Sequence, residues 1–183
     1  MHISLDGYVC GLNGEMNWIK FDQDLFDHVG QRIAKTEAAM YGRKTFDLME
    51  GYWPAAGQQP NATKHDIEHS QWYSKAHKIV LSNSLHGKTL ENTSILNKDF
   101  AAKIKDIKEK ASTEILVFGS PNATNALLHE QLIDGFWLFV NPIVLGEGVP
   151  LFTGTKENMN LKLIGTRQFN CGVVELNYSA VRS

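Results

Sequence analysis

The chain has 183 residues, of which 43% are hydrophobic and 21% charged, and its formal net charge is −2. A chain of this length can bury one core without covalent cross-links, so we expect a single domain over residues 1–183. The balanced charge excludes a general attraction to nucleic acid or to an anionic membrane, and no apolar run approaches the roughly 20 residues of a membrane span. The two cysteines lie far apart and no secretory leader is visible, which predicts a cytoplasmic protein with free thiols.

Apolar runs of strand length alternate with amphipathic stretches through the first three quarters of the chain. This alternation is typical of an α/β fold in which helices cross over between strands. The expected strands are at residues 2–5, 38–41, 77–81, 93–96 and 114–118. The expected helices are at residues 22–35, 44–49, 99–110 and 122–131. Between them, residues 54–74 are polar and are the one candidate for a mobile flap.

The last quarter changes character, because residues 135–145, 161–169 and 172–181 have long strand patterns without a helix between them. We expect these strands to pair antiparallel, with a hairpin turn at Asn170-Cys171-Gly172. Residues 136–140 show no polar alternation, so both faces of that strand should be covered. The core is expected to cover one face, and the other is a candidate for contact with a second subunit.

The most informative motif is Gly42-Arg43-Lys44-Thr45-Phe46, which follows an apolar run and opens a helical pattern. A glycine at a strand-to-helix turn lets the backbone approach a ligand closely. The first N–H groups of the helix then point outward beside two cations, which favours phosphate binding. Similar turns follow two later strands, at Ser82-Asn83-Ser84 and at Gly119-Ser120-Pro121-Asn122-Ala123. Three such turns indicate a nucleotide site, although spacing alone also fits a plain glycine turn with exposed cations.

Several motifs together resemble the dihydrofolate-reductase-like superfamily, and within it the small stand-alone relatives of the riboflavin-biosynthesis reductase domain, the C-terminal domain of RibD. They are Ser4-Leu5-Asp6-Gly7, Gly14-Glu15-Met16-Asn17-Trp18, Gly42-Arg43-Lys44-Thr45-Phe46, Tyr52-Trp53-Pro54, Val80-Leu81-Ser82, Val117-Phe118-Gly119-Ser120 and Pro142-Ile143-Val144-Leu145-Gly146. The resemblance covers nearly the whole chain. It implies a three-layer α/β fold with a mostly parallel central sheet, crossover helices and a C-terminal antiparallel hairpin.

The same resemblance implies an NADPH-dependent reductase that transfers a hydride to a pterin-like or aminopyrimidine heterocycle and that forms homodimers. It places Arg43 and Lys44 by the 2′-phosphate, Ser82 and Asn83 by the adenosine ribose, and Gly119 under the pyrophosphate. The full implied cofactor-binding set is Gly42, Arg43, Lys44, Thr45, Ser82, Asn83, Gly119, Ser120, Asn122 and Ala123. Pro121 departs from the family pattern because it supplies no N–H group to a phosphate.

The catalytic and substrate-binding residues are less clearly marked. A hydride acceptor needs its ring polarised, commonly by a carboxylic acid, and Asp6 at the end of the first strand is the catalytic candidate. Asp6 also fits a turn residue that bonds backbone before Gly7. Asp24 is a candidate for the substrate carboxylate of dihydrofolate reductases or, alternatively, a carboxylate that stabilises a helix start. Trp18 and Trp53 could stack on a flat heterocycle or serve as ordinary core aromatics.

Two alternative functions remain open on sequence. His65-Asp66-Ile67-Glu68-His69 matches the H-x-x-E-H pattern of inverted zinc proteases. A polar connecting segment that happens to contain two histidines is the preferred explanation, because no helix with a third ligand is evident, and no metal is needed by the reductase chemistry. The other alternative is a non-catalytic nucleotide-binding or dimerisation module with the same fold, because fold does not certify activity.

Overall fold

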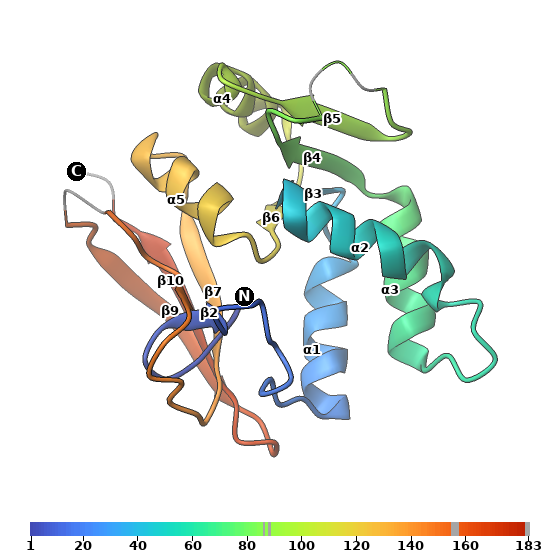
Figure 1. Cartoon of the computed structure of the whole chain (residues 1–183), viewed down its shortest axis with the longest axis vertical. Coiled ribbons are helices and arrows are strands. Elements are labelled where there is room, and N and C mark those ends of the chain that lie inside the picture. Colours follow the sequence, from blue (N-terminus) through green and yellow to red (C-terminus); the bar gives the residue numbers. More distant parts are fainter. Residues whose placement is uncertain (86, 88, 155–157, 182–183) are drawn as a thin grey trace. The chain divides into compact units, whose positions relative to one another are not determined.

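The computed structural model describes residues 1–85, 87, 89–154 and 158–181 (Figure 1). The chain forms two compact units, the first made of Met1–Leu25 and Pro121–Ser183 and the second of Phe26–Ser120. Each unit is described by itself below, and the single-domain expectation stays a prediction. Among the described residues, no helix has both the length and the apolar character needed to cross a membrane.

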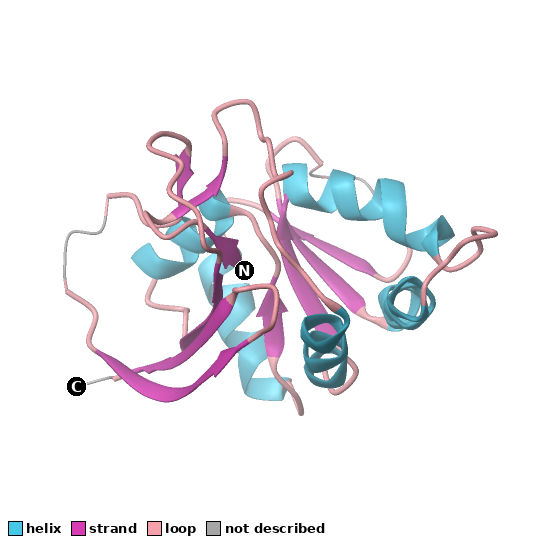
Figure 2. Ribbon diagram, turned by 90° about the horizontal axis from the view of Figure 1, so that it is seen from below, coloured by secondary structure: helices cyan, strands magenta, loops and turns pink. Residues whose placement is uncertain are grey.

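The second unit is built on a four-stranded parallel sheet. Its strands lie in the order β5 (Thr93–Leu96), β4 (His77–Leu81), β3 (Ala38–Gly42) and β6 (Ile115–Val117). Its helices are α1 (Gln23–Ile33), which begins in the first unit, α2 (Arg43–Ala56), α3 (Lys64–Lys75) and α4 (Phe100–Lys110). Figure 2 shows the parallel strands side by side, flanked by helices. Buried aromatic and aliphatic side chains from β3, α2, α3 and β4 form its core, which explains the apolar runs of the two central strands.

The first unit is built on a mixed four-stranded sheet. Its strands lie in the order β1 (His2–Ile3), β7 (Gly135–Val140), β10 (Val174–Ala180) and β9 (Leu161–Gln168), and only β1 and β7 are parallel. The unit also contains α5 (Pro121–His129) and the short antiparallel pair of β2 (Tyr8–Cys10) and β8 (Val149–Pro150). The predicted hairpin between β9 and β10 is confirmed. Its Gly172 has a φ of +88°, and its N–H donates to Phe169 O at 2.9 Å.

The predicted α/β fold, with a parallel sheet and a C-terminal antiparallel hairpin, is confirmed, but the predicted flap at residues 54–74 is wrong. Pro54 lies inside α2, and α3 occupies most of the remaining stretch. The Thr63 hydroxyl accepts the Asp66 N–H at 3.2 Å, while the Asp66 carboxylate accepts the Thr63 N–H at 2.9 Å. This capping box fixes the start of α3. Buried His69 and Tyr73 then anchor a helix whose overall composition is polar.

The structure also corrects the expectation for the apolar strand β7. Phe136 and Leu138 on one face and Phe139 on the other are all buried within the chain itself. Trp137, on the same face as Phe139, is only partly buried, and contact of this face with a second subunit stays a prediction. The strand ends at Val140 instead of continuing to residue 145, because Asn141 and Pro142 interrupt it. The short strands β2 and β8 were not predicted.

Candidate functional site

Three turns at one edge of the parallel sheet come from separate parts of the second unit. They follow β3 at Gly42, β4 at residues 82–84 and β6 at residues 119–120. Strand β3 pairs in parallel with β4 on one side and with β6 on the other. Because parallel strands end at the same sheet edge, these turns lie next to one another, as is typical of ligand sites in α/β sheets.

The start of α2 lies in the middle of these three turns. The N-cap residue Gly42 is extended, with φ −81° and ψ 164°. In the described part of the chain, no side chain caps this helix through its N-cap residue and its first turn holds no acid. The first turn instead carries Arg43 and Lys44. The N–H groups and the positive end of the helix dipole therefore favour an anion here.

Ser120 braces this arrangement. Its hydroxyl oxygen accepts the Gly42 N–H at 2.8 Å, and its hydroxyl group donates to Thr45 Oγ1 at 2.6 Å. Ser120 is buried and has a φ of +59°, which is uncommon for a residue with a side chain. Its hydroxyl is thus used within the protein, where it ties the turn after β6 to the start of α2. The Thr45 hydroxyl, which accepts from Ser120, keeps its own hydrogen for donation to a ligand.

Two features of position 119 favour glycine. Gly119 has a φ of +53°, and a Cβ atom at this position would lie 3.3 Å from Thr45 Cγ2 and 3.4 Å from Thr45 Oγ1. A side chain would be strained by the backbone conformation and would press on the first turn of α2. The glycine therefore keeps the turn after β6 close to the helix start.

The turn after β4 contacts the cation of the first helical turn. Arg43 Nη1 donates to Ser84 Oγ at 2.9 Å, and Arg43 Nε donates to Asp47 Oδ2 at 2.6 Å. Ser82 is buried, and its hydroxyl accepts the Leu85 N–H at 3.1 Å, so it shapes the turn itself. Ser84 and Asp47 were not predicted as site residues. The signal for Asp47 was its i,i+4 spacing from Arg43 on the predicted helix.

The positions of the four remaining residues of the predicted cofactor set say less about cofactor binding. Asn83 and Lys44 are exposed, and the described structure shows neither in a hydrogen bond or ion pair. Asn122 and Ala123 lie on the first turn of α5, which belongs to the first unit. The side chain of Ala123 is buried in that unit. The cofactor role of these four residues stays a prediction.

Asp6 lies in the first unit and holds two loops together. Its carboxylate accepts the Ser4 hydroxyl at 2.6 Å, the Leu145 N–H at 3.1 Å and the Gly146 N–H at 2.8 Å. The Ser4 hydrogen bond, followed by those from the two backbone N–H groups, holds the pKa of Asp6 below its ordinary value. Asp6 is therefore an ionised acceptor near neutral pH and is poorly suited to donate a proton. Its catalytic role stays a prediction.

The three other substrate candidates all have partners within the chain. The Asp24 carboxylate accepts two hydrogen bonds from Arg167 Nη2, at 2.7 and 2.9 Å. Trp18 is largely buried and donates from Nε1 to Glu15 O at 3.0 Å. Trp53 lies in the second unit, where its ring centroid is 3.8 Å from that of His69. These contacts suit packing and structural ion pairing, and the substrate-binding role of the three residues stays a prediction.

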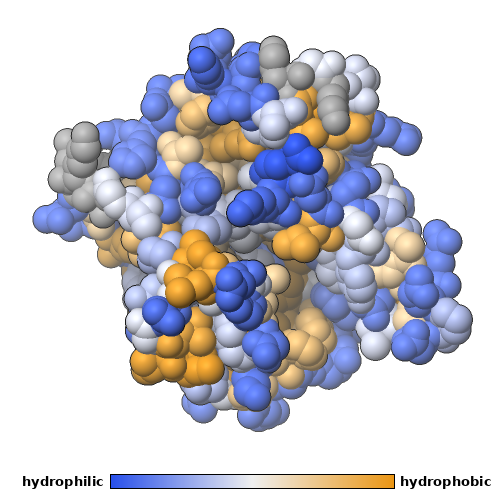
Figure 3. All heavy atoms as spheres, viewed as in Figure 1, coloured by the Kyte–Doolittle hydropathy of each residue, from blue (hydrophilic) through white to orange (hydrophobic). Residues whose placement is uncertain are grey.

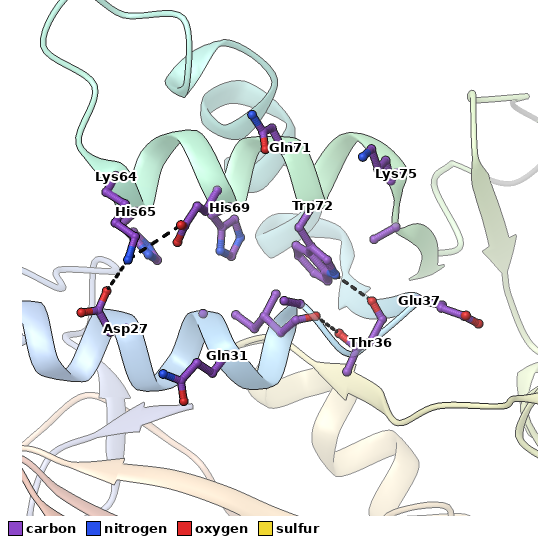
Figure 4. A pocket seen from close by; sticks show the side chains of 15 residues that line it. Asp27, Gln31, Thr36, Glu37, Lys64, His65, His69, Gln71, Trp72 and Lys75 are labelled. Atoms are coloured by element: carbon purple, nitrogen blue, oxygen red, sulfur yellow. Dashed lines mark hydrogen bonds and ion pairs between the residues drawn. The ribbon is translucent and has the colours of Figure 1, made fainter.

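The H-x-x-E-H residues line a groove of about 740 Å³ between α1 and α3 (Figure 4). His65 stacks on Phe26 at 4.2 Å. His69 is buried against Trp53, and its Nε2 finds no hydrogen-bond partner among the described residues. Within the described residues, no group of three or more His, Cys, Asp or Glu side chains could hold a metal ion. The zinc-hydrolase alternative therefore finds no ligand set there. Aromatic packing accounts for both histidines.

Comparisons with known proteins agree with this architecture. The family model of the RibD C-terminal domain matches residues 1–175. Two uncharacterised proteins of Bacillus subtilis (strain 168) are similar to this chain. YyaP is 32% identical over 181 residues, which cover 96% of this chain and 90% of YyaP. YwjB is 24% identical over 177 residues, which cover 96% of this chain and 92% of YwjB.

Solved structures with low sequence identity share the fold. A putative riboflavin biosynthesis protein from Shewanella sp. PV-4 has a TM-score of 0.75 at 19% identity, with 100% of this chain and 97% of that chain covered. Dihydrofolate reductase from Enterococcus faecalis, solved in complex with NADP(H), has a TM-score of 0.63 at 16% identity, with 99% and 94% covered. RibD of Acinetobacter baumannii has a TM-score of 0.65 at 17% identity, and the match covers 98% of this chain but 56% of that chain.

Proposed function

Because this chain belongs to the RibD C-terminal domain family, we propose that it is an NADPH-dependent reductase that acts on a small pterin-like or aminopyrimidine heterocycle. The observation that carries the proposal is the uncapped start of α2, which bears two cations and lies between the turns after β4 and β6. This arrangement suits the phosphate groups of a dinucleotide. The fold is also that of a dihydrofolate reductase solved with NADP(H).

The residues around α2 fit such a cofactor in three ways. The first-turn N–H groups and the Thr45 hydroxyl supply donors for phosphate oxygens. The absence of a side chain at Gly119 lets the backbone after β6 come close to the helix start. Arg43, held beside Ser84, supplies a cation for a 2′-phosphate.

In the proposed reaction, bound NADPH supplies the hydride. The chain's own contribution is to hold the phosphates at the three turns and to orient the acceptor. Asp6 is ionised and tied to the backbone of residues 145–146. We therefore assign it an orienting role toward the acceptor, as a hydrogen-bond acceptor, and not the role of a proton donor.

The proposal is tested by titrating the purified protein with NADPH and, in parallel, with NADH. A ligand that binds the native state raises its stability by mass action, by about 2.7 kcal/mol at 100 times Kd. We expect NADPH to raise the thermal midpoint and to change tryptophan fluorescence at concentrations where NADH has little effect. A folded protein that responds to neither nucleotide would contradict the proposal. Binding of NADPH without turnover of any heterocycle would instead identify a non-catalytic nucleotide-binding module.

We also propose that the protein forms a homodimer through strand β9. In the described sheet β9 is an edge strand of eight residues, and seven of them are exposed. Its exposed apolar side chains include Leu163 and Ile164. The face drawn in Figure 3 shows hydrophobic residues among hydrophilic ones. A long edge strand with exposed apolar residues is a ready site for pairing with a second chain.

Light scattering on a size-exclusion column measures this association. We expect the wild-type protein to elute as a dimer and Ile164→Lys to shift it toward the monomer. Ile67→Lys is the matched control, since Ile67 is an exposed isoleucine on α3 of the other unit. A monomeric wild-type protein, or equal effects of the two substitutions, would exclude β9 as the interface.

A further inference from the structure

The side chain of Arg43 is held at two points. Arg43 lies in the first turn of α2, and its Nε donates to Asp47 Oδ2 at 2.6 Å, one turn further along the helix. Its Nη1 donates to Ser84 Oγ at 2.9 Å, in the turn after β4. The two anchors come from different elements, so they fix both the extension and the rotation of the guanidinium group.

The hydrogen bonds to Asp47 and Ser84 leave donors on the terminal nitrogens of the Arg43 guanidinium available. A guanidinium has five N–H donors, and the two anchoring bonds use one on Nε and one on Nη1. With respect to the described residues, three donors remain, all on the two terminal nitrogens, and the Arg43 side chain is 40% exposed. An arginine with a fixed plane and free terminal donors is suited to contact two oxygens of one phosphate.

The contact between Arg43 and Asp47 differs from an ordinary exposed ion pair. Such i,i+4 pairs contribute little to stability, because water and salt screen both charges. The pair of Asp106 and Lys110 on α4 is of that kind, with the same spacing and the same 2.6 Å distance. Arg43 differs because it is also bound to Ser84 and lies in the first turn of an otherwise uncapped helix.

We propose that Asp47 is a positioning residue that, together with Ser84, presents Arg43 to the 2′-phosphate of the dinucleotide and so sets the preference for NADPH over NADH. This inference rests on the proposed function. Asp47 itself has no ligand contact in this account. A flexible arginine loses side-chain freedom when it binds phosphate, and an arginine that is already held loses less.

The carboxylate of Asp47 also carries a negative charge, which opposes a phosphate nearby. The Asp47 side chain is 51% exposed, so solvent screens this repulsion. The anchoring contact acts directly on the residue that would bind the phosphate. We therefore expect anchoring to outweigh repulsion, and two variants separate the effects, because Asp47→Asn keeps an oxygen acceptor for Arg43 Nε while it removes the charge.

Isothermal titration of NADPH and NADH against purified full-length variants tests the proposal. Asp47→Ala should weaken NADPH binding by about five- to tenfold and leave NADH within about twofold of wild type. Asp47→Asn should stay within about twofold of wild type for both nucleotides. Asp106→Ala is the matched control for losing an exposed i,i+4 ion pair and should change neither affinity.

A double-mutant cycle tests whether Asp47 acts through Arg43. In the Arg43→Ala background, Asp47→Ala should have no further effect on NADPH, because there is no side chain left to position. Tighter NADPH binding in Asp47→Ala, or equal changes for NADPH and NADH, would overturn the positioning role. If the wild-type protein bound neither nucleotide, the proposed function itself would fail. An Asp47→Ala variant that bound NADPH as tightly as wild type would overturn only the positioning role of Asp47.

Discussion

Lowering the pH from 7.0 to 4.5 should destabilise this protein by several kcal/mol, with about half of the histidine contribution traced to His69. His69 is only 8% exposed, and burial lowers its pKa to about 3. His2 is the second such residue, and burial followed by the charge of the amino terminus lowers its pKa to about 3 as well. Neither imidazole is charged in the folded state above that pH.

The direction of this pH effect depends on whether the folded or the unfolded state binds more protons. An unfolded histidine has a pKa near 6.5, so between pH 6.5 and pH 3 the unfolded state takes up a proton that the folded state refuses. Above pH 6.5 these two histidines therefore do not lower the free energy of unfolding. Between pH 6.5 and pH 3 the free energy of unfolding falls by as much as about 1.4 kcal/mol per pH unit for each histidine. At pH 4.5 each of the two histidines costs about 2 to 3 kcal/mol.

Urea unfolding at pH 7.0, 5.5 and 4.5 measures the effect. His69→Phe should remove about half of the pH dependence that His2 and His69 contribute together, because phenylalanine packs against Trp53 without a titratable group. His69→Leu is a smaller replacement if the ring of phenylalanine overpacks the site. His129→Gln, at an exposed position on α5, is the control for removing a histidine. The same slope in His69→Phe, His69→Leu and wild type would contradict the assignment.

Removing the cations of the first α2 turn should impair NADPH binding far more than NADH binding. Each charge-assisted hydrogen bond to a phosphate is worth about 1.5 to 3 kcal/mol, so Arg43→Ala and Lys44→Ala should each weaken NADPH by about ten- to a hundredfold. NADH lacks the 2′-phosphate and should change by less than about threefold. Arg43, held by Ser84 and Asp47, is expected to have the larger effect of the two.

Dissociation constants from titrations at two salt concentrations check this prediction, because screening weakens the charged contacts selectively. Lys110→Ala, an exposed lysine at the end of α4, controls for a general loss of positive charge. Equal weakening of NADPH and NADH by Arg43→Ala and Lys44→Ala would contradict a role in recognising the 2′-phosphate.

The parts of the fold that follow from local patterns could be predicted from the sequence. The parallel strand β3 is a continuous apolar run, β4 ends in the apolar residues Ile79–Leu81, and the hairpin before β10 carries a glycine that adopts a positive φ. The polar segment at residues 54–74 misled the prediction, because its composition hides the capping box of Thr63 and Asp66. Short strands such as β2 were missed, since three residues show no periodicity.

The candidate site, too, could be predicted from the sequence only in part. The turns after β3, β4 and β6 were predicted, because glycine or serine follows a strand in each motif, and a helix follows the turns after β3 and β6. The bond from Asp6 to Gly146 spans 140 positions and could not be predicted from local pattern. The brace of Ser120 was likewise hidden, because a hydroxyl that looks free to bind a ligand is in fact consumed by Gly42 and Thr45.

The contacts of Gly119 and Ser120 with the start of α2 limit which residues of this site could be changed by engineering. Changes at these two positions disturb the backbone that shapes the site, through a strained φ or through a lost partner for the Gly42 N–H. Arg43, Lys44 and Asp47 lie on the accessible side of α2 and support little of the core. Under the proposed function, replaceable surface residues would determine the choice of nucleotide, and a few fixed residues would determine whether a nucleotide binds at all. A change of cofactor would then not cost the protein its fold.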